Sequence, residues 1–317
     1  MSERYVVLTG GVGGAKLCLG LAQLLSPREV VFGVNVGDDF EHLGLRVCPD
    51  IDTLTYALAG LTNPETGWGR RGETWHFIET VRSLGGEDWF NLGDRDLALH
   101  VLRTARLNGG QTLTEVTAGF CQALGIEHGV LPVSDDPVRT VIHTPQGPLA
   151  FQHYFVRERC TPAVSGFSFV GAETARLNSR LGEWLQAPNL AGVILAPSNP
   201  FVSIDPVLAV PGIREQLRRL EVPVVAISPI VAGMAIKGPT AKMMEELGVP
   251  RSALAVALHY EDFLDGFILD SSDEGLLDQL GARGLPAIAT PSVMLTLADK
   301  VALASSTLSF IRQLRAS

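Results

Sequence analysis

Short runs of β-branched and other apolar residues alternate along the chain with stretches in which apolar positions recur at helical spacing. Tyr5–Leu8 is the first run, and a glycine-rich segment separates it from LCLGLAQLL (17–25), which has helical spacing. A second apolar run, Val30–Val34, follows. Two strands joined by one helix are parallel, because the crossover returns the chain to the same end of the sheet. The pattern therefore predicts that the chain opens as a Rossmann-like half.

The same alternation returns towards the C-terminus. Strand-like runs at 192–196 (GVILA), 223–227 (PVVAI) and 266–269 (GFIL) are separated by helical stretches. Strands that alternate with helices are typical of a doubly wound sheet. We therefore expect an α/β protein whose mainly parallel, Rossmann-like core is built from residues 1–60 and 190–317.

The middle of the chain follows a different pattern. Helical segments are expected over 75–84 and 96–107, and further on two alternating runs flank a Pro-Gln-Gly turn at 145–147. Alternating runs around such a turn predict a β-hairpin. Antiparallel structure within a parallel fold indicates an insertion, so we predict an inserted α+β subdomain over 61–189.

Composition and charge narrow the functional classes. The 317 residues are 46% apolar, enough for one large core. A net charge of −9 without a long run of like charges disfavours nucleic-acid and membrane-surface partners. Four scattered cysteines without CxxC spacing disfavour a disulfide framework and a structural zinc site. With neither a signal peptide nor a membrane-length apolar run in view, we expect a cytoplasmic protein that acts on small molecules.

The glycine motif, TGGVGGAK (9–16), follows the first strand and opens a helix. Its backbone N–H groups can approach a phosphate closely, and the helix N-terminus adds a partial positive charge. The motif is not a P-loop, because Ala15 precedes Lys16 and Leu17 replaces the Ser or Thr that binds magnesium. It also departs from the dinucleotide fingerprint, since Lys16 stands at the last glycine. It predicts an anion site, and a tight strand–helix turn is the alternative. The candidate binding residues are Thr9, Gly10, Gly11, Gly13, Gly14 and Lys16.

Acidic residues cluster directly after the second strand, in NVGDDFEHLGLRVCPDIDT (35–53). Open α/β sheets bind ligands at the carboxyl ends of their strands, and carboxylates there favour a hard cation. The stretch therefore predicts a magnesium–diphosphate site beside the glycine motif. For the two later residues, capping of the next helix is the alternative. The four candidate ligands are Asp38, Asp39, Asp50 and Asp52.

Two further loops carry groups that could hold a nucleotide. APSNPFVSI (196–204) follows a strand and offers polar side chains for a base or sugar, although a plain connection is the alternative. In the second loop, Lys237 and free backbone N–H groups meet at the start of a predicted helix, and Pro239 is well suited to the first helical position. The candidate residues are Ser198, Asn199, Pro200 and Ser203 in the first loop, and Lys237, Gly238 and Pro239 in the second.

Other chemistry finds less support. Asp94 and Arg95 begin a helical segment, where we expect Asp94 to cap the helix and Arg95 either to pair with a neighbouring aspartate or to reach an anion. The histidines show no zinc-binding spacing, and no GxSxG motif occurs. Covalent catalysis therefore has no sequence support.

Together with the motifs above, WFNLGDRDLALH, LPVSDDPVRT, FQHYFVRER and AISPIVAGMAIKGPTAKMMEELG resemble, in order from Val6 to Asp270, the 2-phospho-L-lactate transferases of coenzyme F420 biosynthesis. The resemblance implies a magnesium-dependent enzyme, generally a homodimer, with a Rossmann-like core and an added subdomain. Its donor would be GDP linked to phospholactate, phosphoenolpyruvate or phosphoglycerate. The hydroxyl of the deazaflavin Fo would accept the phosphoacyl group, and GMP would leave.

The resemblance also implies roles for particular residues. The glycine motif would line the donor or acceptor pocket, and Asp94 with Arg95 would contact Fo. Asp50 and Asp52 would lie at the Fo and metal end, where one carboxylate orients or deprotonates the hydroxyl. The polar loops at 198–203 and 237–239 would hold the guanosine diphosphate. Small or polar residues are common in the family where this chain has Met234 and Ala235, so the contacts of that loop are expected to differ.

Two other functions remain open from the residues themselves. The opening βαβ unit with a downstream acidic residue is compatible with a dinucleotide-dependent oxidoreductase, which nicotinamide binding would test. A non-catalytic nucleotide-sensing protein on the same fold is the second, since fold does not fix function, and it would bind GDP without turnover.

Overall fold

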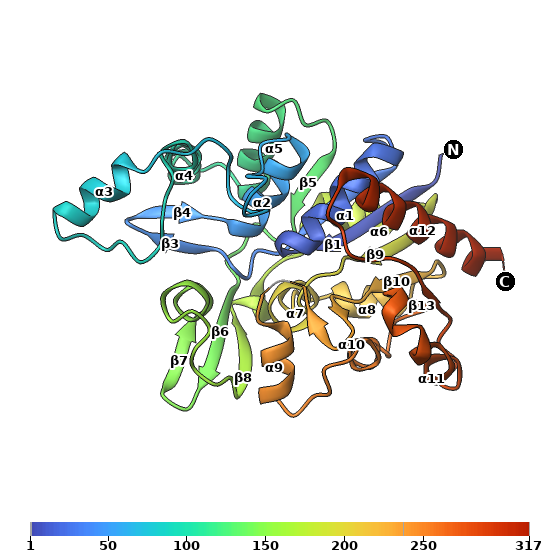
Figure 1. The fold of residues 1–317 in the computed structure, drawn as a ribbon. Coiled ribbons are helices and arrows are strands. Elements are labelled where there is room, and N and C mark those ends of the chain that lie inside the picture. Colours follow the sequence, from blue (N-terminus) through green and yellow to red (C-terminus); the bar gives the residue numbers. More distant parts are fainter. Residues whose placement is uncertain (1, 237, 317) are drawn as a thin grey trace.

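A seven-stranded sheet forms the centre of the protein in a computed structural model, which describes residues 2–236 and 238–316 (Figure 1). All neighbouring strands are parallel, and their order is β14-β13-β10-β9-β1-β2-β5. The structure confirms the α/β fold. The strands are β1 (Arg4–Thr9), β2 (Val30–Val34), β5 (Gly129–Pro132), β9 (Leu190–Leu195), β10 (Val224–Ile227), β13 (Gly266–Leu269) and β14 (Ala287–Ala289).

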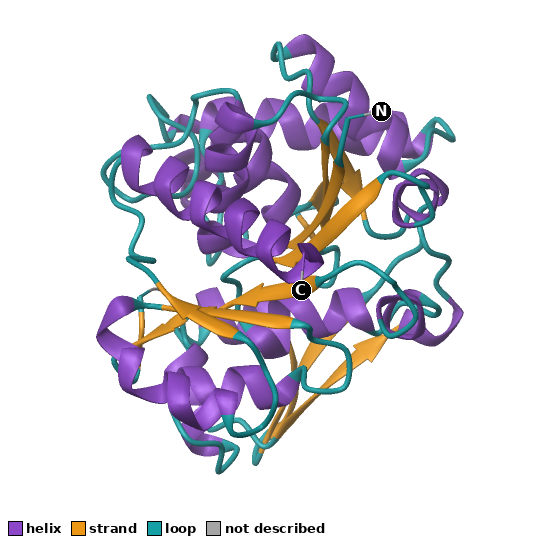
Figure 2. Ribbon diagram, turned by 90° about the vertical axis from the view of Figure 1, so that its right-hand side faces the viewer, coloured by secondary structure: helices purple, strands orange, loops and turns teal. Residues whose placement is uncertain are grey.

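Helices flank both faces of this sheet (Figure 2). Because both faces are covered, β2, β9, β10 and β13 are buried throughout and read as continuous apolar runs. The helices are α1 (Gly11–Leu24), α2 (Pro49–Leu58), α3 (His76–Ser83), α4 (Asp94–Asn108), α5 (Leu113–Ala123), α6 (Ser179–Leu185), α7 (Asp205–Leu208), α8 (Ile213–Leu217), α9 (Thr240–Glu246), α10 (Ala253–His259), α11 (Leu277–Gly281) and α12 (Leu297–Ala316). Among the described residues, no helix has the length and apolar character needed to cross a membrane.

The order of strands reverses between β1 and β9. From β1 the chain proceeds through α1 to β2 and then to β5, whereas β9, β10, β13 and β14 follow one another on the other side of β1. The loops that leave the carboxyl ends of β1 and β9 therefore face each other across this switch point. Ligands of open α/β sheets bind at such a point.

Smaller elements stand apart from the main sheet (Figure 1). One group comprises the hairpin of β3 (Phe40–His42) and β4 (Leu45–Val47) with α3 and α4. The other is an antiparallel sheet of order β7-β6-β8. Its strands are β6 (Arg139–Thr144), β7 (Gly147–Ala150) and β8 (Gly166–Val170). The hairpin expected around residues 145–147 is confirmed by the pairing of β6 with β7.

The range 61–189, assigned to the insertion from the sequence, also contributes to the main sheet. β5 is the edge strand that pairs with β2, and α6 packs against β1 and β2. Val130 and Leu131 are buried in the main core, which places this short strand there. A strand of four residues ending in proline gives too weak a pattern for its partner to be assigned from the sequence.

Candidate functional site

The loops that follow β1, β2 and β9 meet at the switch point. The Ser198 hydroxyl donates to the Gly10 carbonyl at 2.7 Å and accepts from the Gly10 N–H at 3.3 Å. The Gly11 N–H donates to Asp50 Oδ1 at 2.7 Å. The structure thus brings together the predicted glycine motif, one polar loop and one residue of the acidic stretch.

The glycines of the motif allow the chain to pack closely against itself. Helix α1 already begins at Gly11, whose φ of +65° suits glycine. A Cβ on Gly13 would lie 2.4 Å from the Pro197 carbonyl oxygen, and one on Gly14 would lie 2.0 Å from Thr9 Oγ1. A Cβ on Gly10 would meet Asp50 Oδ2 at 2.6 Å. Much of the glycine requirement therefore comes from the close approach of the loops after β1 and β9.

Asn35 organises a pair of buried carboxylates. Its Nδ2 donates to Asp38 Oδ1 at 3.1 Å and to Asp50 Oδ2 at 2.9 Å, and its Oδ1 accepts from the Gly37 N–H at 2.8 Å. Asp38 and Asp50 are only 7% and 6% exposed. Among the described residues, neither carboxylate has an ion-pair partner within 4 Å. This Asn35 group, Asn35 with Asp38 and Asp50, is therefore a buried pair of carboxylates without a compensating cation among the described residues.

Burial is the main cause of the pKa shifts in this region. It raises the pKa of Asp38 well above its usual range, and the Asp50 carboxylate raises it further. Burial raises the pKa of Asp50 to about 6, against the hydrogen bonds from Asn35 and Gly11. It raises the pKa of Asp39 to about 7, against the opposing charge of Arg139. Asp39 Oδ1 is buried and has no hydrogen-bond partner among the described residues.

Asp52 belongs to a different cluster. Both of its carboxylate oxygens bond the guanidinium of Arg103, a side chain that is only 1% exposed. His100 Nδ1 lies 3.8 Å from Asp52 Oδ2, and His100 Nε2 lies 3.4 Å from Asp96 Oδ2. The Tyr56 hydroxyl donates to Asp96. This Arg103 cluster joins α2 to α4, and within it the buried Asp52 carboxylate is paired with a guanidinium.

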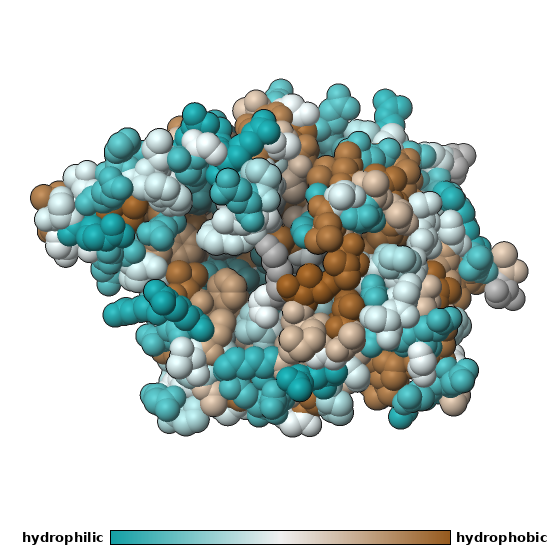
Figure 3. All heavy atoms as spheres, viewed as in Figure 1, coloured by the Kyte–Doolittle hydropathy of each residue, from teal (hydrophilic) through white to brown (hydrophobic). Residues whose placement is uncertain are grey.

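Aromatic side chains gather next to the acidic stretch. Trp89 packs edge-on against His42 and His153, with ring centroids 5.0 and 4.6 Å apart, and Phe40 packs edge-on against Phe90 at 4.8 Å. Trp89 Nε1 and His42 Nε2 are buried without a partner among the described residues. Figure 3 shows a hollow in the surface between the group formed by β3, β4, α3 and α4 and the antiparallel sheet of β6, β7 and β8. Since Phe40 follows Asp39 directly, these five residues, the aromatic cluster, adjoin the acidic stretch.

The remaining residues predicted after β9 and in α1 make contacts within the protein. Lys16 Nζ donates to the Met294 carbonyl at 2.8 Å. Asn199 Oδ1 accepts from the Phe201 N–H at 3.0 Å, and Pro200 begins a π-helical turn that contains the buried Ser203.

The second predicted anion site lies at the start of a short helix. Pro239 stands at the N-cap of α9 rather than at its first position, and α9 has only seven residues. Gly238 is exposed with a φ of +75°. Lys237 lies outside the described residues. The described part of this loop therefore offers exposed backbone, but little of a helix dipole.

Asp94 caps a helix other than its own. Its carboxylate accepts from the backbone N–H groups of His76 and Phe77 at 3.2 and 3.0 Å, at the start of α3. The Thr74 hydroxyl also donates to it and is the largest cause of its lowered pKa. Arg95, the next residue of α4, is exposed. Capping thus accounts for the contacts that Asp94 makes in this structure.

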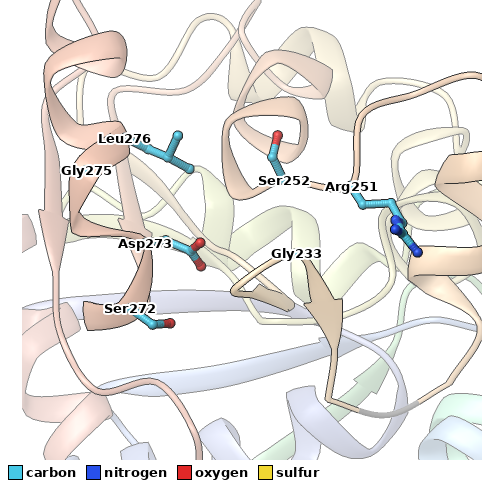
Figure 4. Close-up of a pocket in the computed structure, with 7 residues that line it drawn as sticks. All are labelled: Gly233, Arg251, Ser252, Ser272, Asp273, Gly275 and Leu276. Atoms are coloured by element: carbon cyan, nitrogen blue, oxygen red, sulfur yellow. The ribbon is translucent and has the colours of Figure 1, made fainter.

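A pocket of about 310 Å³ opens at the carboxyl ends of β10 and β13, beside the hairpin of β11 (Ile230–Val231) and β12 (Met234–Ala235). Asp273 Oδ2 accepts from the Ala232 N–H at 2.9 Å. Figure 4 shows its carboxylate directed into the space, with Arg251 on the opposite side. The pocket lies at the same edge of the sheet as the Asn35 group. Its lining residues are Gly233, Arg251, Ser252, Ser272, Asp273, Gly275 and Leu276.

A family model described as 2-phospho-L-lactate transferase CofD matches residues 5–287. The chain belongs to the CofD family. A protein of Streptomyces griseus named phosphoenolpyruvate transferase is 38% identical over 319 residues, covering 99% of this chain and all of that protein. A protein of the same name from Nocardia farcinica is 39% identical over 300 residues and covers 90% of each chain.

Solved structures agree with this assignment at the level of the fold. Protein BH3568 of Bacillus halodurans superposes with a TM-score of 0.63 at 16% identity, over 97% of this chain and 100% of that one. A second crystal structure of BH3568, described as a member of the UPF0052 family, gives a TM-score of 0.60 at 14% identity. The CofD-family chain therefore shares its fold with BH3568.

Several residues that complete these groups are not predicted from the sequence. Asn35 was not singled out, although an amide at the carboxyl end of a strand and three residues before an aspartate is a usable signal. Arg103 lies in an ordinary helical pattern, and spacing along the chain does not reveal that it is the buried partner of Asp52. Trp89 and His153 come from distant segments, so only the fold brings them together.

Proposed function

We propose that the protein transfers a phosphoacyl group from a GDP-linked three-carbon acid to the hydroxyl of Fo, with release of GMP, in coenzyme F420 biosynthesis. The observation that carries this proposal is the Asn35 group, which lies beside the glycine motif at the switch point of the sheet. The relatives named phosphoenolpyruvate transferase favour phosphoenolpyruvate as the group carried. Membership of the CofD family supports the reaction class.

The donor chemistry requires positioning and charge neutralisation rather than a covalent enzyme intermediate. The acceptor hydroxyl oxygen forms a bond to the phosphorus that bears the three-carbon acid, the bond from that phosphorus to GMP breaks, and the hydroxyl proton passes to a base. Such transfers depend mainly on alignment and electrostatic stabilisation. Exposed backbone at Gly238 and the polar groups after β9 are suited to bind the nucleotide end.

The Asn35 group fits a magnesium ion. Asp38 and Asp50 supply hard oxygen ligands, they share one amide donor, and no described cation offsets their charge. In this proposal they hold Mg²⁺, which would neutralise the diphosphate during transfer. Asp52, Asp96 and His100 also place one ligand atom each within 4.8 Å of one another. Asp52 in that set already pairs with Arg103, whereas neither Asp38 nor Asp50 has such a partner among the described residues, so we assign the ion to the Asn35 group.

The aromatic cluster supports a planar acceptor. Rings arranged edge to face leave faces and edges on which a further aromatic system can pack. The unpartnered Trp89 Nε1 can donate to a carbonyl of a ring system. Asp39 lies between this cluster and the Asn35 group along the chain, and its unpartnered Oδ1 is suited to accept the hydroxyl proton.

The test is a reaction with purified protein, Fo, magnesium and each of the three GDP-linked acids. Chromatography with mass detection follows GMP and the extended deazaflavin. We expect product from the phosphoenolpyruvate donor, and none when magnesium is removed by a chelator. A single competent donor would identify the acid, and light scattering on the same sample tests the expected homodimer.

A different outcome favours the second candidate. Binding of GDP without product from any donor would contradict the transferase proposal and support a nucleotide-sensing protein on this fold. Binding of a nicotinamide dinucleotide instead of GDP would favour the oxidoreductase.

A further inference from the structure

The segment 152–164 connects elements on two sides of the candidate site. At its start, Gln152 Nε2 donates to the Asp38 carbonyl at 3.4 Å, and the His153 ring packs on Trp89. The segment thus begins against the acidic stretch and the aromatic cluster.

At its other end the same segment is held by α9. Lys242 Nζ donates to the Pro162 carbonyl at 2.9 Å and to Glu246 Oε1 at 2.5 Å. Glu246 Oε2 accepts from the Val164 N–H at 3.0 Å. Lys242 also lies 5.7 Å from the centre of the buried Tyr154 ring. We call these contacts, made by Lys242 and Glu246 to the segment, the α9 latch.

A neighbouring face of α9 contacts the loop after β9. Asn199 Nδ2 lies 3.5 Å from Met243 Sδ, and Asn199 is one of the predicted nucleotide-binding residues. Helix α9 also follows directly on Gly238 and Pro239. A displacement of α9 would therefore move the loop to which the proposed function assigns the donor.

The latched segment adopts strained backbone. His153–Arg157 form a π-helical turn, and Arg159 and Cys160 have φ values of +49° and +57°. Non-glycine residues avoid this region, and two in succession persist only where surrounding contacts impose them. Here the Cys160 N–H donates to the Tyr154 carbonyl at 2.9 Å. This hydrogen bond holds the strained turn beside the α9 latch.

We propose that Lys242 and Glu246 are positioning residues, which fix the loop before α9 against the acidic stretch through the strained segment 152–164. The inference rests on the proposed function only in assigning the donor to that loop. The contacts themselves connect the two ends of the site whatever the ligand is.

The first test compares Glu246→Gln with Glu245→Gln, which makes the same change one position earlier on α9. Glu245 is exposed and pairs only with Arg251 among the described residues. We expect Glu246→Gln to speed amide exchange over residues 238–246 and to raise the KM for the donor about tenfold, with a smaller effect on kcat. Glu245→Gln should match the parent protein in both measurements. Equal exchange and equal KM in the two variants would overturn the proposal.

A second variant separates positioning from stability. Cys160→Gly relieves the left-handed strain, so we expect an unchanged or higher Tm. If the strain serves to position α9, the same variant should still raise the donor KM, because the turn becomes easier to distort. A raised Tm with an unchanged KM would contradict that role.

The exchange measurement distinguishes failure of this inference from failure of the proposed function. If the parent protein neither binds GDP nor forms product, the transferase proposal fails. Faster exchange in Glu246→Gln alone would still support the latch, and equal exchange in both variants would overturn it.

Discussion

Asp50 and Asp52 lie two residues apart in the first turn of α2, yet the structure gives them different partners. Asp50 accepts neutral donors from Asn35 and Gly11, whereas Asp52 forms a buried ion pair with Arg103. Both residues are 6% exposed. Burial of a carboxylate is costly unless a cation or strong donors compensate it. Arg103 compensates Asp52 within the protein, whereas no described cation compensates Asp50, so a cationic ligand can do so.

Helix geometry explains why the two carboxylates separate. Residues two apart on an α-helix point about 200° from each other around its axis, since each residue turns the chain by about 100°. One side of α2 faces the glycine motif and the other faces α4. Neighbouring aspartates thus belong to two sites, one suited to chemistry and one to stability.

Removal of charge from the Asn35 group should have the largest effect. Asp50→Asn keeps an acceptor for the Gly11 N–H but removes a proposed magnesium ligand. We expect transfer to fall by about 100-fold or more, because removal of one electrostatic contact in an active site costs about that much. The Tm should stay the same or rise, since a costly buried charge is lost. Activity close to that of the parent protein would remove Asp50 from the site.

Disruption of the Arg103 cluster should act on stability instead. Arg103→Met leaves Asp52 buried and unpaired, and loss of one partner from a buried pair costs about 3–5 kcal/mol. Chemical unfolding measures this loss, and the double variant Arg103→Met with Asp52→Leu should recover most of it. If Asp52 were catalytic, the double variant would be stable, but its activity would be far lower than its folded fraction predicts.

Magnesium and pH should distinguish the two groups more finely. The folded pKa of Asp50, about 6, lies above the ordinary 3.8, so the folded state binds more protons than the unfolded state between these values. For the metal-free protein, the stability contributed by Asp50 is therefore present at low pH and is lost as pH rises from about 4 to about 6. Near neutral pH, magnesium should raise the Tm of the parent protein. Asp50→Asn should show a smaller loss, because the pKa values of Asp38 and Asp39 are also raised, and it should not respond to magnesium. A magnesium response equal to that of the parent would contradict the assignment.

The smallest effect is expected at Asp94, a third carboxylate, which caps α3. Asp94→Ala removes the acceptor for the N–H groups at the start of α3. We expect faster amide exchange in α3 with little change in the KM for Fo. A large rise in that KM would instead support the direct contact that the family resemblance implies.

The sequence by itself determined the parallel α/β architecture. Buried strands require continuous apolar runs and surface helices require helical spacing, and both patterns are local. β1, β2 and β9 were found in this way, as were α3 and α4 within a residue or two. The glycine motif and the acidic stretch were also visible, because loops after parallel strands meet at one edge of the sheet.

Only the tertiary structure decided which partner each polar side chain has. Asp50 and Asp52 are the same residue type in one helical turn, and no local pattern distinguishes a carboxylate beside Asn35 from one beside Arg103. The edge position of β5 and the contact between Gln152 and Asp38 likewise depend on segments about 100 residues apart in the chain. Pairing energies of buried polar groups depend on such distant neighbours, and these neighbours become known only when the chain is folded.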